Sequence, residues 1–91
     1  MDKIKKGQIV KATSGRDVNS FFDGFFAVLD TPAAGFAILA DGASRKLRNP
    51  KKKSIKHLKF TNTVVDLSQV LSLGSDKMLR KLLTEFVSNE K

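Results

Sequence analysis

Short runs of β-branched, aromatic and aliphatic residues, separated by turn residues, fill the first two thirds of the chain. This pattern is typical of short strands rather than helices. The runs predict five strands, at residues 7–13, 25–30, 36–40, 43–47 and 57–61. Five short strands at this spacing favour a small antiparallel barrel over a sandwich, so the expected fold is a mainly β, five-stranded barrel followed by α structure.

Two connections between these strands carry recognisable turn chemistry. Residues 31–35 contain Pro32 and suit a hairpin turn rather than a crossover helix. Asp41 and Gly42 directly follow the third run, and an aspartate–glycine pair between two β runs is typical of a type I′ hairpin. The sequence therefore predicts a tight turn at Asp41-Gly42, with residues 43–47 as the return strand. The carboxylates of Asp17 and Asp41 are expected to cap backbone amides at their turns.

After residue 62 the apolar residues change to helical spacing. Leu67, Val70 and Leu71 predict a first helix that ends at Gly74, and Ser75 can cap a second helix from Asp76 to about residue 88. The second helix has an apolar face, formed by Met78, Leu79, Leu82, Leu83, Phe86 and Val87. The expected organisation is a barrel with a basic segment at 1–61 and a helical extension packed on it at 62–91, together one domain. The alternative is a docking helix for a partner protein or a second copy.

Composition narrows the function classes. The 91 residues contain no Cys and one His, which excludes disulfide, zinc-ribbon and iron–sulfur sites. The nine acids show no close pair for acid–base catalysis, and no nucleophile–His–acid set or phosphate-cradling glycine loop is present, so neither an enzyme nor a cofactor or metal site is expected. No apolar run is long enough for a membrane span, and the basic start at residues 1–6 lacks the apolar region of a signal peptide. We expect a soluble, cytoplasmic protein without a membrane partner.

Positive charge is the main clue to function. Seventeen Lys and Arg against nine Asp and Glu give a net charge of +8, which favours a polyanionic partner such as nucleic acid. Residues 45–59 hold eight of these cations and no acid. Lysines suit phosphates, whereas Arg45 and Arg48 could also stack on or pair with exposed bases. The alternative is a solvated basic loop with no partner.

Several aromatic side chains allow two interpretations. His57 is expected to pack against the barrel with one ring nitrogen on a backbone carbonyl; direct stacking on a base is the alternative. Phe21 and Phe22 lie at the edge of the loop before the second strand, where packing in the core or in a small loop cluster is expected. Exposed there, they could instead stack on unpaired bases.

Several segments resemble a known family. The motifs are GQIV at residues 7–10, SGRD at 14–17, FAVL at 26–29, ADG at 40–42 and, in the basic segment, RKL, PKKK and KHL at 45–47, 50–53 and 56–58. The first three resemble a KOW motif, a strand, a glycine-centred loop and a second strand. Together, over residues 5–61, they resemble bacterial KOW-domain RNA-binding proteins related to the archaeal and eukaryotic large-subunit ribosomal protein fourteen-e family.

This resemblance implies an SH3-like barrel that binds ribosomal RNA without catalysis, with Gly15 as the loop glycine and Arg16 as an RNA contact. Residues 18–24 look like an insertion, which could make its own contact with RNA or a ribosomal or other protein through Phe21 and Phe22. The alternative function is a protein-interaction or transcription-associated KOW domain with nonspecific nucleic-acid contact. The predicted RNA-binding residues are Lys11, Arg16, Arg45, Lys46, Arg48, Lys51, Lys52, Lys53, Lys56, His57 and Lys59.

Overall fold

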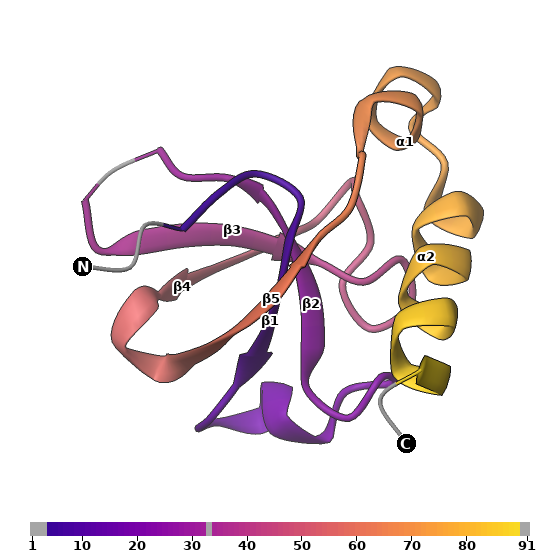
Figure 1. Ribbon diagram of the computed structural model, residues 1–91. Helices are drawn as coiled ribbons and strands as arrows, with labels where there is room; N and C mark the ends of the chain where they lie inside the picture. Colours follow the sequence, from indigo (N-terminus) through magenta and orange to yellow (C-terminus); the bar gives the residue numbers. More distant parts are fainter. Residues whose placement is uncertain (1–3, 33, 90–91) are drawn as a thin grey trace.

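A computed structural model describes residues 4–32 and 34–89 (Figure 1). Five antiparallel strands form one sheet: β1 (Gln8–Ala12), β2 (Phe25–Asp30), β3 (Phe36–Ala40), β4 (Lys51–Ser54) and β5 (Leu58–Val64). Two 3₁₀ turns, η1 (Arg16–Asn19) and η2 (Ile55–His57), and two helices, α1 (Ser68–Leu73) and α2 (Asp76–Asn89), complete the fold. The expected sequence of five strands followed by helices is confirmed.

The sheet is open, and the expected barrel is not confirmed. The strand order is β4-β3-β2-β1-β5, and within residues 4–32 and 34–89 no ladder pairs the two edge strands β4 and β5. The short turn η2 connects β4 to β5 along the chain, and single backbone hydrogen bonds at its two ends extend the β3–β4 and β1–β5 pairings. The N–H of Ile55 donates to the carbonyl of Gly35 (2.8 Å), and the N–H of Thr13 donates to the carbonyl of His57 (2.9 Å).

The predicted return strand at residues 43–47 is wrong, because the side chain of Asp41 organises a loop there. Asp41 is fully buried, and its Oδ1 accepts hydrogen bonds from the backbone N–H groups of Ala43 (2.9 Å) and Arg45 (2.8 Å). These amides are therefore not available to β3. Gly42 has φ 80°, but Asp41 is not in the positive-φ region, so the turn is not type I′. The expected amide-capping role of Asp41 is confirmed.

The return strand is β4, which lies within the basic segment. Its residues pair with β3 in the register Ala37↔Lys53, Ile38↔Lys52 and Leu39↔Lys51. Directly opposite residues in an antiparallel pair point to the same face of the sheet. Lys51 and Lys53 therefore share the face of Leu39 and Ala37, whereas Lys52 points to the other face.

Each face of the sheet carries its own apolar cluster, as strand alternation requires. One cluster joins the sheet to the helices, through Ile9, Phe22, Ala27, Ala40, Leu67, Val70, Leu79, Leu83 and Phe86. The opposite face holds Val10, Ala12, Phe26, Val28, Ala37 and Leu39, with Ile4, Ile55, Leu58 and Phe60 packed against them. Both helices lie on the same side of the sheet (Figure 1).

The helices begin and end where their sequence signals lie. Gly74 ends α1 in the left-handed region (φ 60°), and the Oγ of Ser75 accepts a hydrogen bond from the N–H of Met78 (3.2 Å) at the start of α2. The carboxylate of Asp76 accepts a hydrogen bond from the N–H of Leu47 (2.8 Å), and Arg80 Nη1 donates to the carbonyl of Gly42 (2.7 Å). Helix α2 is therefore fixed to the loop at residues 41–50 as well as to the sheet. Neither described helix has the length and apolar character needed to cross a bilayer.

Candidate nucleic-acid interface

The connection between β1 and β2, residues 13–24, contacts the chain just before the basic segment at residues 45–59 and again near the end of that segment. On one side, the N–H of Phe21 donates a hydrogen bond to Oγ of Ser44 (2.7 Å). On the other side, the N–H of Thr13 donates to the carbonyl of His57 (2.9 Å). Residues far apart in the sequence are thus brought together around this connection, and exposed Arg16 at the start of η1 belongs to it.

Gly15 directs the chain into η1. Its backbone has φ 79° and ψ −172°, a combination that is essentially restricted to glycine. A Cβ at this position would meet only the Nζ of Lys53, at 3.5 Å. The requirement for glycine therefore comes from the backbone rather than from lack of space. Gly15, expected as the loop glycine, thus has a positive φ that explains why glycine is needed there.

Asp17 is the centre of a buried ion cluster, and its pairing with Arg45 and Lys53 is not predicted from the sequence. The residue is 7% exposed, and its expected role of capping amides is wrong. Its Oδ2 lies 3.0 Å from Nζ of Lys53, and its Oδ1 lies 3.4 Å from Nη2 of Arg45. Lys53 Nζ also donates a hydrogen bond to the carbonyl of Ser14 (2.9 Å). Two of the predicted RNA contacts, Arg45 and Lys53, thus hold the loop at residues 13–20 against β4.

The charges around Asp17 stabilise its ionised form. Burial of the carboxylate acts to raise its pKa, but the hydrogen bond from Lys53 and the positive charges of Lys53, Arg45 and Lys51 outweigh that effect. The pKa of Asp17 therefore lies below its ordinary value. Asp17 stays negative at neutral pH and neutralises part of the local positive charge.

The remaining cations of the segment at residues 45–59 face solvent to different degrees. Within the described residues, Arg45 and Lys53 are the members of this group that form ion pairs. The side chains of Lys46, Arg48, Lys52, Lys56 and Lys59 are exposed, and that of Lys51 is half-buried.

Lys11 and Lys59 form a second basic feature. They lie directly opposite each other in the β1–β5 ladder, where two like charges repel. The Nζ of Lys11 lies 5.0 Å from the ring centroid of Phe25. A phosphate placed near the two ammonium groups would relieve their repulsion.

The aromatic candidates divide between surface and core. His57 is exposed, so the expected packing of its ring against the sheet is wrong. Phe22 is buried (6% exposed), in agreement with the expected core role, whereas Phe21 is 70% exposed. The two rings meet edge to face with centroids 4.9 Å apart.

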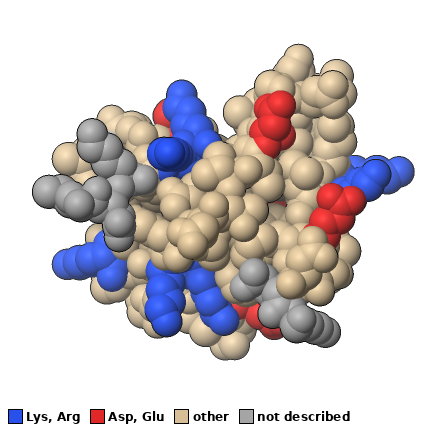
Figure 2. All heavy atoms as spheres, in the orientation of Figure 1, with Lys and Arg blue, Asp and Glu red and all other residues tan. Residues whose placement is uncertain are grey.

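Figure 2 shows how charge is distributed over one face of the molecule. Several Lys and Arg side chains project along its lower left rim, where Figure 1 draws η2 and the end of β1, and the middle of this face is uncharged. The cations on this face therefore form a border rather than a continuous patch.

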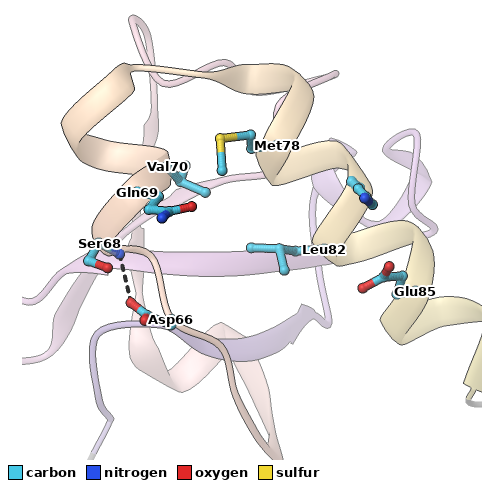
Figure 3. Close-up of a pocket in the computed structure, with 8 residues that line it drawn as sticks. Asp66, Ser68, Gln69, Val70, Met78, Leu82 and Glu85 are labelled. Atoms are coloured by element: carbon cyan, nitrogen blue, oxygen red, sulfur yellow. Dashed lines mark hydrogen bonds between the residues drawn. The ribbon is translucent and has the colours of Figure 1, made fainter.

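A separate groove lies between α1 and α2 (Figure 3). Its volume is about 520 Å³, and its lining mixes the apolar side chains of Val70, Met78 and Leu82 with charged and polar ones. At its edge Asp66 accepts a hydrogen bond from the N–H of Ser68 (2.9 Å), which lowers the pKa of that carboxyl. None of the predicted RNA-binding residues lines this groove.

The described residues contain no group of three or more His, Cys, Asp or Glu side chains arranged to hold a metal ion. No protein-family profile matches the chain, and no curated protein matches it in sequence.

Proposed function

We propose that this protein is a non-catalytic RNA-binding protein that contacts the phosphate backbone through exposed cations around the β1–β2 connection. The observation that carries the proposal is the set of cations between residues 45 and 59 that form no ion pair within the described part of the chain, namely Lys46, Arg48, Lys51, Lys52, Lys56 and Lys59. Binding to phosphates would release condensed counterions and relieve the repulsion between these side chains.

We further propose that the sheet is an open variant of an SH3-like barrel of the KOW type and that the RNA is ribosomal. Two features support this. The edge strands β4 and β5 are joined by only the three residues of η2, and β1 is followed by a loop whose glycine adopts a positive φ before β2. The second feature agrees with the strand, glycine loop and strand pattern of the motif that the sequence resembles, and the first keeps the two edge strands adjacent along the chain.

Salt dependence tests the phosphate contacts. If about five phosphates are neutralised, log K for binding to large-subunit ribosomal RNA should fall with log[salt] at a slope of about −3.5 to −4.5 in filter-binding titrations. The double variant Lys56→Gln/Lys59→Gln should make this slope shallower by about 1.4 to 1.8. The matched control is Lys77→Gln/Lys81→Gln, which removes two exposed lysines of α2 and should leave the slope unchanged.

A slope close to zero for the parent protein would refute the proposal. An equal change in both variants would show that only net charge matters and that the interface is not where we place it. Co-sedimentation with ribosomal subunits through a sucrose gradient tests the ribosomal assignment separately, because RNA binding without co-sedimentation would leave the first proposal intact and contradict the second.

A further inference from the structure

Phe21 is the most exposed of the large aromatic side chains in the described residues, and its ring packs against the buried ring of Phe22. The ring is 70% exposed, and its edge-to-face neighbour Phe22 is 6% exposed within the core cluster. A buried aromatic side chain fixes the position of the ring that rests on it. Phe21 therefore presents a supported aromatic surface to solvent.

The backbone around Phe21 is also held in place. Its N–H is bonded to Oγ of Ser44, and the N–H of Gly24 donates to Oγ of Ser20 (2.9 Å). Asp23 adopts φ 56°, a left-handed conformation that a residue with a side chain seldom takes. Such conformations persist where the surrounding contacts fix them, and they are concentrated at binding and active sites. The exposure of Phe21 thus belongs to an ordered turn.

The surroundings of Phe21 are basic. Ser44, which holds its amide, is followed by Arg45 and by exposed Lys46, and η1 contributes exposed Arg16. Of the two acids in the connection at residues 13–24, Asp17 is already paired with Arg45 and Lys53, and Asp23 is exposed. An anionic partner is therefore favoured at this surface over a neutral or basic one.

A second exposed aromatic provides a comparison. Phe36 is 39% exposed, and the ammonium of Lys52 lies over its ring, 4.8 Å from the centroid. In the described part of the chain, no cation lies over the ring of Phe21 in this way. The ring of Phe21 is thus open to a planar partner, whereas that of Phe36 is partly occupied.

We infer that Phe21 stacks on an unpaired base of single-stranded RNA, with Arg16 and Lys46 on the flanking phosphates; this deepens the proposed RNA binding and rests on it. A base within a duplex is stacked on both sides and cannot offer its face, so the contact selects single-stranded or splayed-out nucleotides. Aromatic stacking tolerates all four bases, and this site therefore discriminates strandedness more than sequence.

Tryptophan substitution gives a direct readout, because the chain contains no Trp and no Tyr. We would titrate Phe21→Trp and, as a matched control, Phe36→Trp with a twelve-nucleotide oligouridylate and with a twelve-base-pair RNA duplex. The emission of the tryptophan at position 21 should be quenched by the single strand and not by the duplex. The emission of the tryptophan at position 36, next to the ammonium of Lys52, should change to the same extent with both RNAs, because a phosphate bound to Lys52 does not require an unpaired base.

Affinity measurements complete the test. Phe21→Ala should weaken oligouridylate binding by about 5- to 150-fold, the range found for loss of one base-stacking contact, whereas Phe36→Ala should weaken it less than about 2-fold. Because Phe21 is exposed, both its variants should melt within a few degrees of the parent in circular dichroism, which separates a binding defect from a folding defect.

The outcomes distinguish this inference from the proposal beneath it. Parent binding that Phe21→Ala leaves unchanged, with no quenching at position 21, would overturn the stacking contact and preserve RNA binding. Preference for the duplex would also overturn stacking. Failure of the parent to bind any RNA would overturn both, and concentration-dependent self-association abolished by Phe21→Ala would then identify the ring as a protein contact.

Discussion

Replacing Asp17 with asparagine should destabilise the fold at neutral pH, because it leaves the ammonium group of Lys53 without a counter-charge. The side chains of Asp17 and Lys53 are 8% and 9% exposed, so neither is well hydrated. Removing one partner of a buried ion pair costs about 3–5 kcal/mol. Lys53 keeps its bond to the carbonyl of Ser14, and Arg45 is 33% exposed and can rehydrate. We therefore expect a loss of free energy of unfolding at the lower end, about 3 kcal/mol.

The effect should depend on pH in a defined direction. The pKa of Asp17 lies below its ordinary value of 3.8 in the folded protein, so folding favours the ionised carboxylate. Its contribution to stability is complete above the unfolded-state pKa and is lost as the pH falls through the lower, folded-state pKa. The stability difference between the parent and Asp17→Asn should therefore be constant from about pH 6 upward and should shrink below about pH 4.

Urea denaturation across this pH range measures the free energy of unfolding, and a thermal scan at neutral pH measures the melting temperature, both followed by circular dichroism. At neutral pH the melting temperature should fall by about 12–24 °C, since 1 kcal/mol corresponds to about 4–8 °C in a domain of this size. Asp23→Asn is the matched control, because Asp23 is exposed in the same β1–β2 connection and asparagine tolerates its left-handed backbone, so its urea midpoint should stay close to that of the parent. Adding Lys53→Met to Asp17→Asn should recover part of the loss. Equal urea midpoints for the parent and Asp17→Asn, or a difference that persists unchanged at pH 2–3, would refute the reasoning.

Two further predictions concern Gly15 and α2. Gly15→Val forces a side chain into a backbone conformation that is essentially restricted to glycine (φ 79°, ψ −172°). Thermal melting should therefore show a loss of about 1–3 kcal/mol in the free energy of unfolding, and filter binding should show weaker RNA affinity. Melting and binding like those of the parent would contradict the loop assignment. Truncation after Gly74 removes Leu79, Leu83 and Phe86 from the core, each worth about 1.5–3 kcal/mol, and should abolish cooperative unfolding in calorimetry. A 1–74 chain that unfolds cooperatively would show that α2 is dispensable for the fold.

Local sequence signals were sufficient for four of the five strands. The strand predicted at residues 57–61 corresponds to Leu58–Val64. Runs of apolar and β-branched residues bounded by turn residues predicted strands at residues 7–13, 25–30 and 36–40, and the structure has Gln8–Ala12, Phe25–Asp30 and Phe36–Ala40. In these strands alternate side chains enter the two apolar clusters, which is the pattern from which a strand can be recognised.

The fourth strand could not be found in this way. The four residues of β4 are three lysines and a serine, with no apolar alternation, and their extended conformation depends on pairing with β3. The preceding turn was misleading for a related reason. Asp41 and Gly42 have the composition of a two-residue hairpin, but a buried carboxylate that binds two amides of its own loop is a tertiary feature. Neither the pairing of β4 with β3 nor the burial of Asp41 can be recognised from the few residues on either side.

The candidate site was predictable as a list of charges but not as a surface. The segment at residues 45–59 is basic in any conformation, yet Arg45 and Lys53 turn toward Asp17, which is 28 and 36 residues away in the chain. Asp17 had no such local signal, because residues 12–24 hold one cation, Arg16, and two acids, Asp17 and Asp23. The local sequence does not reveal which cations Asp17 binds.

Strand geometry explains why one lysine of the basic segment stabilises the fold while others face solvent. An extended run of three lysines must send its members alternately to opposite faces, so Lys51 and Lys53 turn to the face that holds Ala37 and Leu39, while Lys52 turns to the other. The side chain of Lys53 is 9% exposed, and its ammonium pairs with the carboxylate of Asp17 from the loop that follows β1, whereas half-buried Lys51 forms no ion pair among the described residues. The contact fixes that loop next to β4, and with it Arg16. Under the proposed function, Lys53 is therefore a positioning residue for the interface. The phosphates are bound by the cations of the basic segment that face solvent.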